Sequence, residues 1–125
     1  GTEKPHPDVA TSYGNIGGVY NSMGKYLEAL TEYKNSLDIF LKVYGTKKPH
    51  PYVASSYGNI GNVYCSIGKY PEALREYKKS LDIYLKVYGT EKPHPDVATS
   101  YGNIGSVYYS MGKYPEALTE HKKSL

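Results

Sequence analysis

The stretch GTEKPHP at residues 1–7 decides how this chain folds, because it comes back twice. It returns as GTKKPHP at residues 45–51 and as GTEKPHP at residues 89–95, so the sequence repeats with a period of 44 residues. Self-similarity at a fixed period is typical of a solenoid, in which one small unit of secondary structure stacks on the next. We therefore expect a stack of repeats that presents a long surface for holding another molecule.

The period divides the 125 residues into three units, at 1–44, 45–88 and 89–125, which we expect to form one solenoid domain. The third unit is truncated, because it ends at Leu125, the counterpart of Leu81. Solenoids normally end in repeats with a polar outer face, and no such cap is recognisable in this sequence. We therefore expect the chain to be a piece of a longer array.

Each unit reads as two helices followed by a loop. In the first unit Pro7 and Asp8 fit a helix start, since proline suits the first turn and an acidic side chain suits the helix dipole there. Gly45 fits a helix end. Between these points apolar residues recur at the i, i+3, i+4 spacing of helices with one buried face. The first helix carries them at Ala10, Tyr13, Ile16, Gly17 and Tyr20, and the second at Ala29, Leu30, Tyr33, Leu37, Phe40, Leu41 and Tyr44.

Applied to all three units, this pattern predicts an all-α fold. Antiparallel helix pairs with short turns build an α-solenoid, here of three repeats with the last one truncated. The helices are expected near residues 8–22, 27–43, 52–66, 71–87, 96–110 and 115–124.

Composition excludes several classes of function. The formal net charge is only +3, far from the strongly basic character of a nucleic-acid binder. No apolar run approaches the roughly 18 residues that cross a bilayer, so we expect no contact with a membrane. Cys65 is the only cysteine, which excludes a disulfide within the chain and favours a reducing, cytoplasmic location.

The repeated residues resemble the tetratricopeptide repeat (TPR) over the whole chain. The period is ten residues longer than the common 34, and this extra length resembles the long-repeat subgroup of kinesin light chains. The chain departs from the family pattern where Tyr replaces the usual Trp, where Leu41 and Leu85 replace a proline, and where His121 replaces an aromatic residue. The matching positions in the first unit are Tyr13, Ile16-Gly17, Tyr20, Gly24-Lys25-Tyr26, Ala29, Tyr33 and Ser36-Leu37, and they recur in register in the other two units.

The resemblance implies that the first helix of each unit lines a concave groove and that the second faces outward. Helical geometry independently places a polar stripe on the side of each first helix that lies opposite its apolar face. The stretches 9–24, 53–68 and 97–112 contain no charged residue, so this groove is expected to be uncharged. The candidate groove residues are Thr11, Asn15, Gly18, Ser22, Ser55, Asn59, Asn62, Ser66, Thr99, Asn103, Ser106 and Ser110.

Asn15, Asn59 and Asn103 recur at one position and are predicted to form a ladder along this groove. An asparagine amide offers both a donor and an acceptor, so it can pair with the backbone of an extended peptide whatever side chains that peptide carries. Related adaptors use groove asparagines in this way, which the resemblance extends to these positions. The alternative is that asparagine merely solvates an exposed helix face, since units this similar would repeat any residue.

The groove positions hold no Lys or Arg that could meet a C-terminal carboxylate, so the carboxylate-clamping type of TPR ligand is not expected. A peptide or an amphipathic helix of a partner protein fits better. A second hypothesis is self-association: Leu118 and Leu125 of the last helix could stack end to end on Ala10 and Tyr13 of another copy. RNA binding is disfavoured, because phosphate contacts need cations.

Nothing in the sequence indicates catalysis, a cofactor or a metal site, and we expect the chain not to be an enzyme. His6, His50 and His94 recur singly between prolines, and a metal would need several convergent ligands. We expect these histidines to shape the loops and His121 to fill a site between helices. Cys65 has no candidate catalytic partner.

Overall fold

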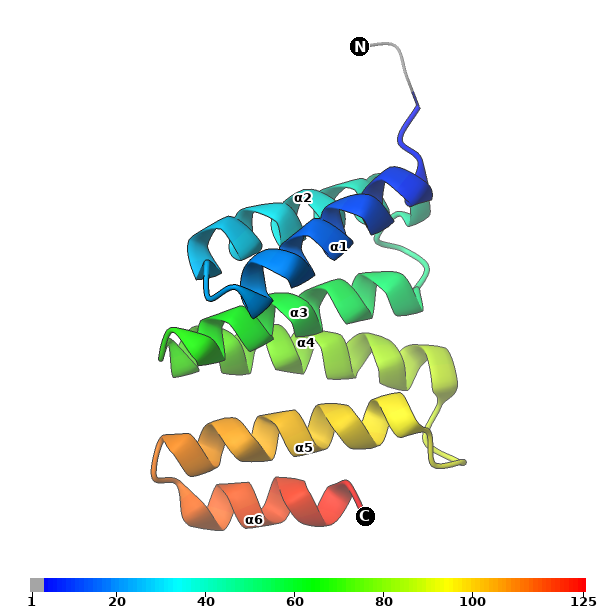
Figure 1. Ribbon diagram of the computed structural model, residues 1–125. Coiled ribbons are helices and arrows are strands. Elements are labelled where there is room, and N and C mark those ends of the chain that lie inside the picture. Colours follow the sequence, from blue (N-terminus) through cyan, green and yellow to red (C-terminus); the bar gives the residue numbers. More distant parts are fainter. Residues whose placement is uncertain (1–3) are drawn as a thin grey trace.

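The computed structural model describes residues 4–125, and over this range the chain forms six α-helices in three antiparallel pairs (Figure 1). The predicted all-α, helix-pair solenoid is confirmed, and every predicted helix boundary lies within one residue of the observed one. The helices are α1 (Pro7–Ser22), α2 (Tyr26–Tyr44), α3 (Pro51–Ser66), α4 (Tyr70–Tyr88), α5 (Pro95–Ser110) and α6 (Tyr114–Lys123).

The first helix of each pair starts at a proline that directly follows a histidine. The imidazole of His50 accepts a hydrogen bond at its Nδ1 from the backbone N–H of Tyr52, 3.1 Å away, and so caps α3. His6 and His94 cap α1 and α5 in the same way, with distances of 3.0 and 3.1 Å. The proline needs no partner, because it has no N–H. The prediction that these histidines shape the loops is therefore confirmed.

Glycine lies in each short turn within a pair and directly after α2 and α4. Gly24 has φ = +76° between α1 and α2, and Gly45 has the same φ directly after α2. Only glycine adopts this backbone region without a steric cost. As a result the helices of a pair turn back on each other within a few residues.

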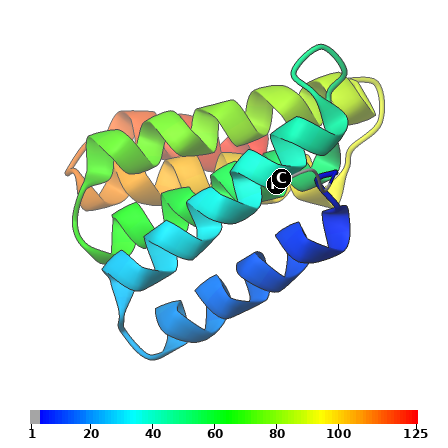
Figure 2. The same ribbon diagram turned by 90° about the horizontal axis from the view of Figure 1, so that it is seen from above.

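The pairs stack one on another, with the short turns at one end of the helices and the longer loops 45–50 and 89–94 at the other (Figures 1 and 2). The predicted division into units at 1–44, 45–88 and 89–125 stays a prediction, and residues 1–3 of the first unit lie outside the described range.

The core lies between the pairs. Tyr33 of α2 packs with Ile60 and Val63 of α3, and Tyr77 of α4 packs with Ile104 and Val107 of α5. These side chains are almost entirely buried. Burial of apolar surface at each interface between pairs is the main force that stacks the repeats.

The two ends of the stack differ from the sequence-based expectation. Ile16 was expected to be buried, but it is 45% exposed, because no helix of a preceding pair covers α1 in the described chain. His121 lies against Gly105 of α5 as a filler between helices should, yet it is classed as exposed, since no further pair covers α6. Tyr33 and Tyr77, which occupy the position of His121 in the first two units, are buried.

Candidate binding surface

A first hollow of about 260 Å³ lies between α1 and α3. Ser36 and Phe40 of α2 form its floor, between α1 and α3. Ser36 is buried and donates a hydrogen bond of 2.7 Å to the backbone oxygen of Ala10, which ties α2 to α1 at this point. The walls are formed by Thr11, Gly14 and Asn15 of α1 and by Tyr52, Ser55, Ser56 and Asn59 of α3.

A second hollow of about 160 Å³ lies between α3 and α5, with Ser80 and Tyr84 of α4 at its floor. Ser55 and Asn59 of α3 line both hollows, so the two form one continuous polar surface across the first helices. The remaining walls are Gly58 and Asn62 of α3 and Asp96, Thr99, Ser100 and Asn103 of α5.

The three asparagines of the predicted ladder all line this surface. Asn15 is exposed, and Asn59 and Asn103 are half-buried. Within residues 4–125 no other side chain forms a hydrogen bond with any of these three amides. Each amide therefore keeps a donor and an acceptor available for a molecule that enters the hollows.

Asn62 behaves differently from the ladder asparagines. Its side-chain oxygen accepts a hydrogen bond from the hydroxyl group of Tyr77, which rises from α4 beneath it. Burial raises the pKa of that hydroxyl, so it stays protonated and can donate. Asn62 therefore keeps its amide N–H groups for a ligand, and part of the accepting capacity of its oxygen is already used.

The expectation of an uncharged surface is wrong at one residue. Asp96, at the start of α5, lines the second hollow. It lies one residue before the charge-free stretch 97–112, so the sequence pattern missed it. Its side chain is 45% exposed and accepts a hydrogen bond of 3.1 Å from the hydroxyl group of Tyr88.

Five of the predicted site residues line neither hollow. They lie toward the carboxyl ends of α1, α3 and α5, beyond the two hollows. The hydroxyl group of Ser66 donates instead to the backbone oxygen of Asn62, at 3.1 Å. The five residues are Gly18, Ser22, Ser66, Ser106 and Ser110, and their role in binding stays a prediction.

Sequence reasoning also missed residues that the structure adds to the surface. Phe40 was placed on the apolar stripe of its helix, and Tyr84 is its counterpart in the second unit. Phe40 is buried and Tyr84 is half-buried, and each forms part of a hollow floor. Tyr52 is exposed and packs with Phe40, their ring centroids being 5.4 Å apart. The signal that could have found Tyr52 is a break in the repeat, because the other two units hold aspartate, Asp8 and Asp96, at this position.

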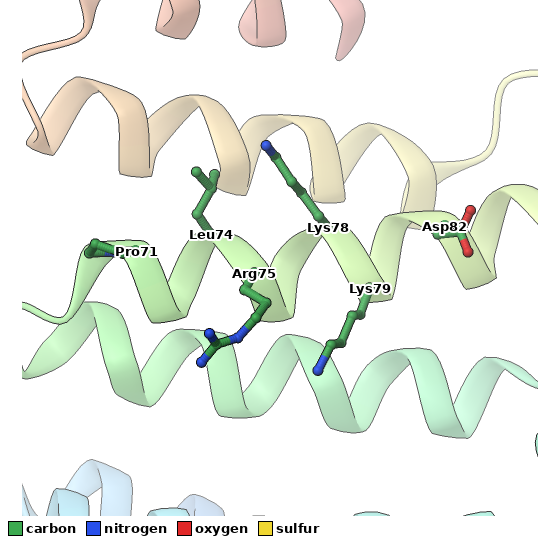
Figure 3. Close-up of a pocket in the computed structure, with 6 residues that line it drawn as sticks. All are labelled: Pro71, Leu74, Arg75, Lys78, Lys79 and Asp82. Carbon is green, nitrogen blue, oxygen red and sulfur yellow. The ribbon is translucent and has the colours of Figure 1, made fainter.

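A shallower hollow lies on the other side of the molecule, over the outer face of α4 (Figure 3). There Leu74 and Lys78 extend toward α5 while Arg75 and Lys79 extend toward α3. The ammonium group of Lys78 lies 5.7 Å from the ring of Tyr108, and that of Lys79 lies 5.3 Å from the ring of Tyr57. These cations lie over half-buried tyrosine rings, so we assign this face to stability instead of recognition.

Cys65 is half-buried, and burial raises the pKa of its thiol. A thiol that stays protonated is a poor nucleophile. Among the described residues, no group of three or more His, Cys, Asp and Glu side chains converges as metal ligands would. Over the same range, no helix combines the length and the apolar character needed to cross a membrane.

The chain belongs to the tetratricopeptide repeat family, whose model matches residues 8–86 and 52–125. No curated protein sequence matches the chain. Family members are typically non-enzymatic scaffolds that mediate protein–protein interaction.

Solved structures show the same fold at low sequence identity. BtubC (BKLC) from P. vanneervenii is 23% identical, with a TM-score of 0.87 over 97% of this chain and 47% of BtubC. A putative kinesin light chain from Podosopora anserina with nearly identical TPR-like repeats is 20% identical, with a TM-score of 0.78 over 98% of this chain and 56% of that one. The TPR domain of Arabidopsis FLU is 19% identical, with a TM-score of 0.79 over 94% of this chain and 92% of the domain.

The chain thus spans about half the length of the BtubC and Podosopora structures. The predicted resemblance to kinesin-light-chain-like repeats is confirmed at the level of the fold.

Proposed function

We propose that this chain holds an extended segment of a partner protein along the surface that crosses α1, α3 and α5. The observation that carries the proposal is the position of Asn15, Asn59 and Asn103, whose amides have no partner in the described chain and line two adjoining hollows. An asparagine side chain can bond the N–H and C=O groups of a passing backbone. Such hydrogen bonds recognise the extended backbone of a ligand and do not depend on its side chains.

The role that we propose is one of binding, without catalysis and in the cytoplasm. It is supported by the typical behaviour of the family as scaffolds and by the polar, open character of the two hollows. The residues Gly18, Ser22, Ser66, Ser106 and Ser110 would extend the contact toward the carboxyl ends of the first helices.

A peptide selection tests this proposal. Octapeptides blocked at both ends would be selected on the wild-type chain and then titrated by calorimetry against the variant Asn15→Ala/Asn59→Ala/Asn103→Ala. Each lost hydrogen bond contributes about 1 kcal/mol, so we expect the dissociation constant to rise at least about tenfold.

The matched control is Asn35→Ala, which removes an exposed asparagine on α2 that lines neither hollow. It should leave the dissociation constant unchanged, and circular dichroism should show that both variants keep their helices. Equal affinity of the triple variant and the wild type would refute the proposal that the asparagine ladder binds the peptide backbone.

A second candidate function, end-to-end self-association, is supported by the outer face of α1. Val9, Ile16 and Val19 are 49, 45 and 60% exposed, whereas their counterparts in α3 are 5, 2 and 0% exposed, because α2 covers them. The counterparts are Val53, Ile60 and Val63.

The opposite end offers the matching face. Tyr114, Leu118 and Leu125 are all exposed, and the counterparts of the first two in α4, Tyr70 and Leu74, pack against the core beside α5. We propose that α6 of one copy can cover α1 of the next in the manner in which α2 covers α3. The receiving residues differ from the prediction, since Ala10 is fully buried against Phe40 and Val53 and cannot receive a partner.

Sedimentation velocity at increasing concentration tests this association. The wild-type sedimentation coefficient should rise with concentration, and Val19→Glu should abolish the rise, because a charge cannot be buried there without a large cost. Thr31→Glu, an exposed change on α2, is the control that should leave it intact. A wild-type chain that stays monomeric at high concentration would exclude this function.

A further inference from the structure

The two hollows are copies of one another. Their nine shared positions correspond one to one at a spacing of 44 residues, and only Asn62 is added in the second. Seven of the nine positions hold the same side chain or exchange only serine and threonine. The two hollows therefore share most of their lining residues and differ in side-chain chemistry at two positions. The two differences are Phe40 against Tyr84 and Tyr52 against Asp96.

The first hollow is aromatic at both of these places. Phe40 lies at the floor and Tyr52 at the rim, with 40° between their ring planes. Phe40 is buried, whereas Tyr52 is exposed and so can cover an incoming group. No charged side chain lines this hollow. An apolar side chain placed here would exchange water mainly for the exposed ring of Tyr52.

The second hollow is acidic at the same rim position. The carboxylate of Asp96 is half-exposed and lies in the first turn of α5, near the positive end of the helix dipole. Burial, and to a smaller extent the negative charge of Asp96, raises the pKa of the Tyr84 hydroxyl at the floor. Asp96 and Tyr84 line this same hollow.

No cation among the described residues neutralises this carboxylate. The Nδ1 atom of His94 is 3.8 Å away, but it accepts the backbone N–H of Asp96, so it donates no hydrogen bond to the carboxylate. The hydroxyl group of Tyr88 satisfies only part of the hydrogen-bonding capacity of the carboxylate. The remaining lone pairs of the carboxylate can accept hydrogen bonds from a cationic group of a ligand.

We propose that the ligand of this surface is a segment that carries a bulky apolar side chain for the hollow between α1 and α3 and a lysine or arginine for the hollow between α3 and α5. This inference rests on the proposed peptide-binding function and adds the chemistry of the partner to it. The order of the two hollows along the stack also gives the ligand one direction along the surface.

A swap of the two rim residues tests the inference. The probe is a positional-scanning library of octapeptides, blocked at both ends, in which single positions are fixed as Lys/Arg, Phe/Leu or Glu. On the wild-type chain we expect one position to favour Lys/Arg over Glu by about three- to tenfold, and another to favour Phe/Leu. In Tyr52→Asp/Asp96→Tyr the two preferences should exchange places.

Asp96→Asn provides the matched single change, since asparagine still accepts the hydrogen bond from Tyr88 but carries no charge. It should remove the Lys/Arg preference and its dependence on salt, and it should leave the Phe/Leu preference in place. Thermal unfolding followed by circular dichroism establishes that each variant is folded.

The outcomes separate the two claims. If the wild-type chain retains peptides without a Lys/Arg preference, or if Asp96→Asn keeps that preference, the inference is overturned while peptide binding stands. If the wild-type chain retains no peptide at all, both the inference and the proposed function are overturned.

Discussion

At the scale of single residues, glycine takes opposite roles within one helix. A methyl group built on Gly61 would lie 2.8 Å from the ring of Tyr77, closer than real contacts allow. A methyl group on Gly58 would meet only the hydroxyl oxygen of Ser80 at 3.6 Å, an ordinary contact. Gly61 is thus required for the approach of α4 to α3, whereas Gly58 is not required by packing.

Two alanine substitutions should therefore have opposite signs. Gly61→Ala should lower the free energy of unfolding by about 1–3 kcal/mol, because overpacking displaces the Tyr77 ring. Gly58→Ala should raise it by about 0.5–1 kcal/mol, since alanine is the better helix former. Urea unfolding followed by circular dichroism measures both, and the same sign for the two variants would contradict the packing described for α3 and α4.

The residue scale also shows where sequence reasoning stopped. The helical period put Asn15, Asn59 and Asn103 on the polar face of their helices, where they line the two hollows, because a face depends on one helix alone. It could not show that Tyr77 would engage Asn62, because that contact depends on how α4 crosses α3. Asp96 was missed since the rotation of α5 at its first turn decides whether that residue faces the hollow.

At the scale of helices, each loop between pairs uses one histidine for two contacts. The imidazole of His50 caps α3 and also stacks on the ring of Tyr44 at the end of α2, with centroids 3.6 Å apart and 7° between the planes. His94 stacks on Tyr88 in the same way, at 3.4 Å. The histidine therefore joins the end of one pair to the start of the next.

The cap makes stability depend on pH. Burial lowers the pKa of His50 below its ordinary value near 6.5, so the unfolded chain takes up this proton first as the pH falls. The contribution of His50 is complete above pH 6.5 and is lost between pH 6.5 and the lowered pKa of the folded state. The urea midpoint should fall from pH 7.5 to pH 5.5.

The variant His50→Asn isolates this residue from the other histidines. Asparagine supplies a capping oxygen that does not titrate in this range, so the fall between the two pH values should become smaller than in the wild type. An unchanged fall would show that the cap of α3 is not the titrating group.

The element scale is where the sequence was most informative. The 44-residue period, the proline after each histidine and the glycine after α2 and α4 were sufficient to place all six helices within one residue. These signals are local, so they need no knowledge of the neighbours. The hollow floors at Phe40 and Tyr84 were not predicted as part of the site, because they arise only when two first helices lie on either side of a second one.

At the scale of the whole molecule, identical residues have different surroundings according to their place in the stack. The apolar face of α1 is exposed, whereas the same face is covered in α3 and α5. The sequence pattern predicts which face of each first helix is apolar. It does not predict whether another helix covers that face, since the pattern is the same in every unit. The two exposed ends and the side surface across α1, α3 and α5 are thus separate candidates for interaction.

The side-chain amide signals of asparagine in a ¹H–¹⁵N spectrum test the central claim most directly. During titration with an octapeptide selected on the wild-type chain, the signals of Asn15, Asn59 and Asn103 should shift together, and that of Asn35 on α2 should stay in place. Shifts that spare the three ladder amides and gather instead on the outer face of α4, or on α1 and α6 at the ends, would contradict the account.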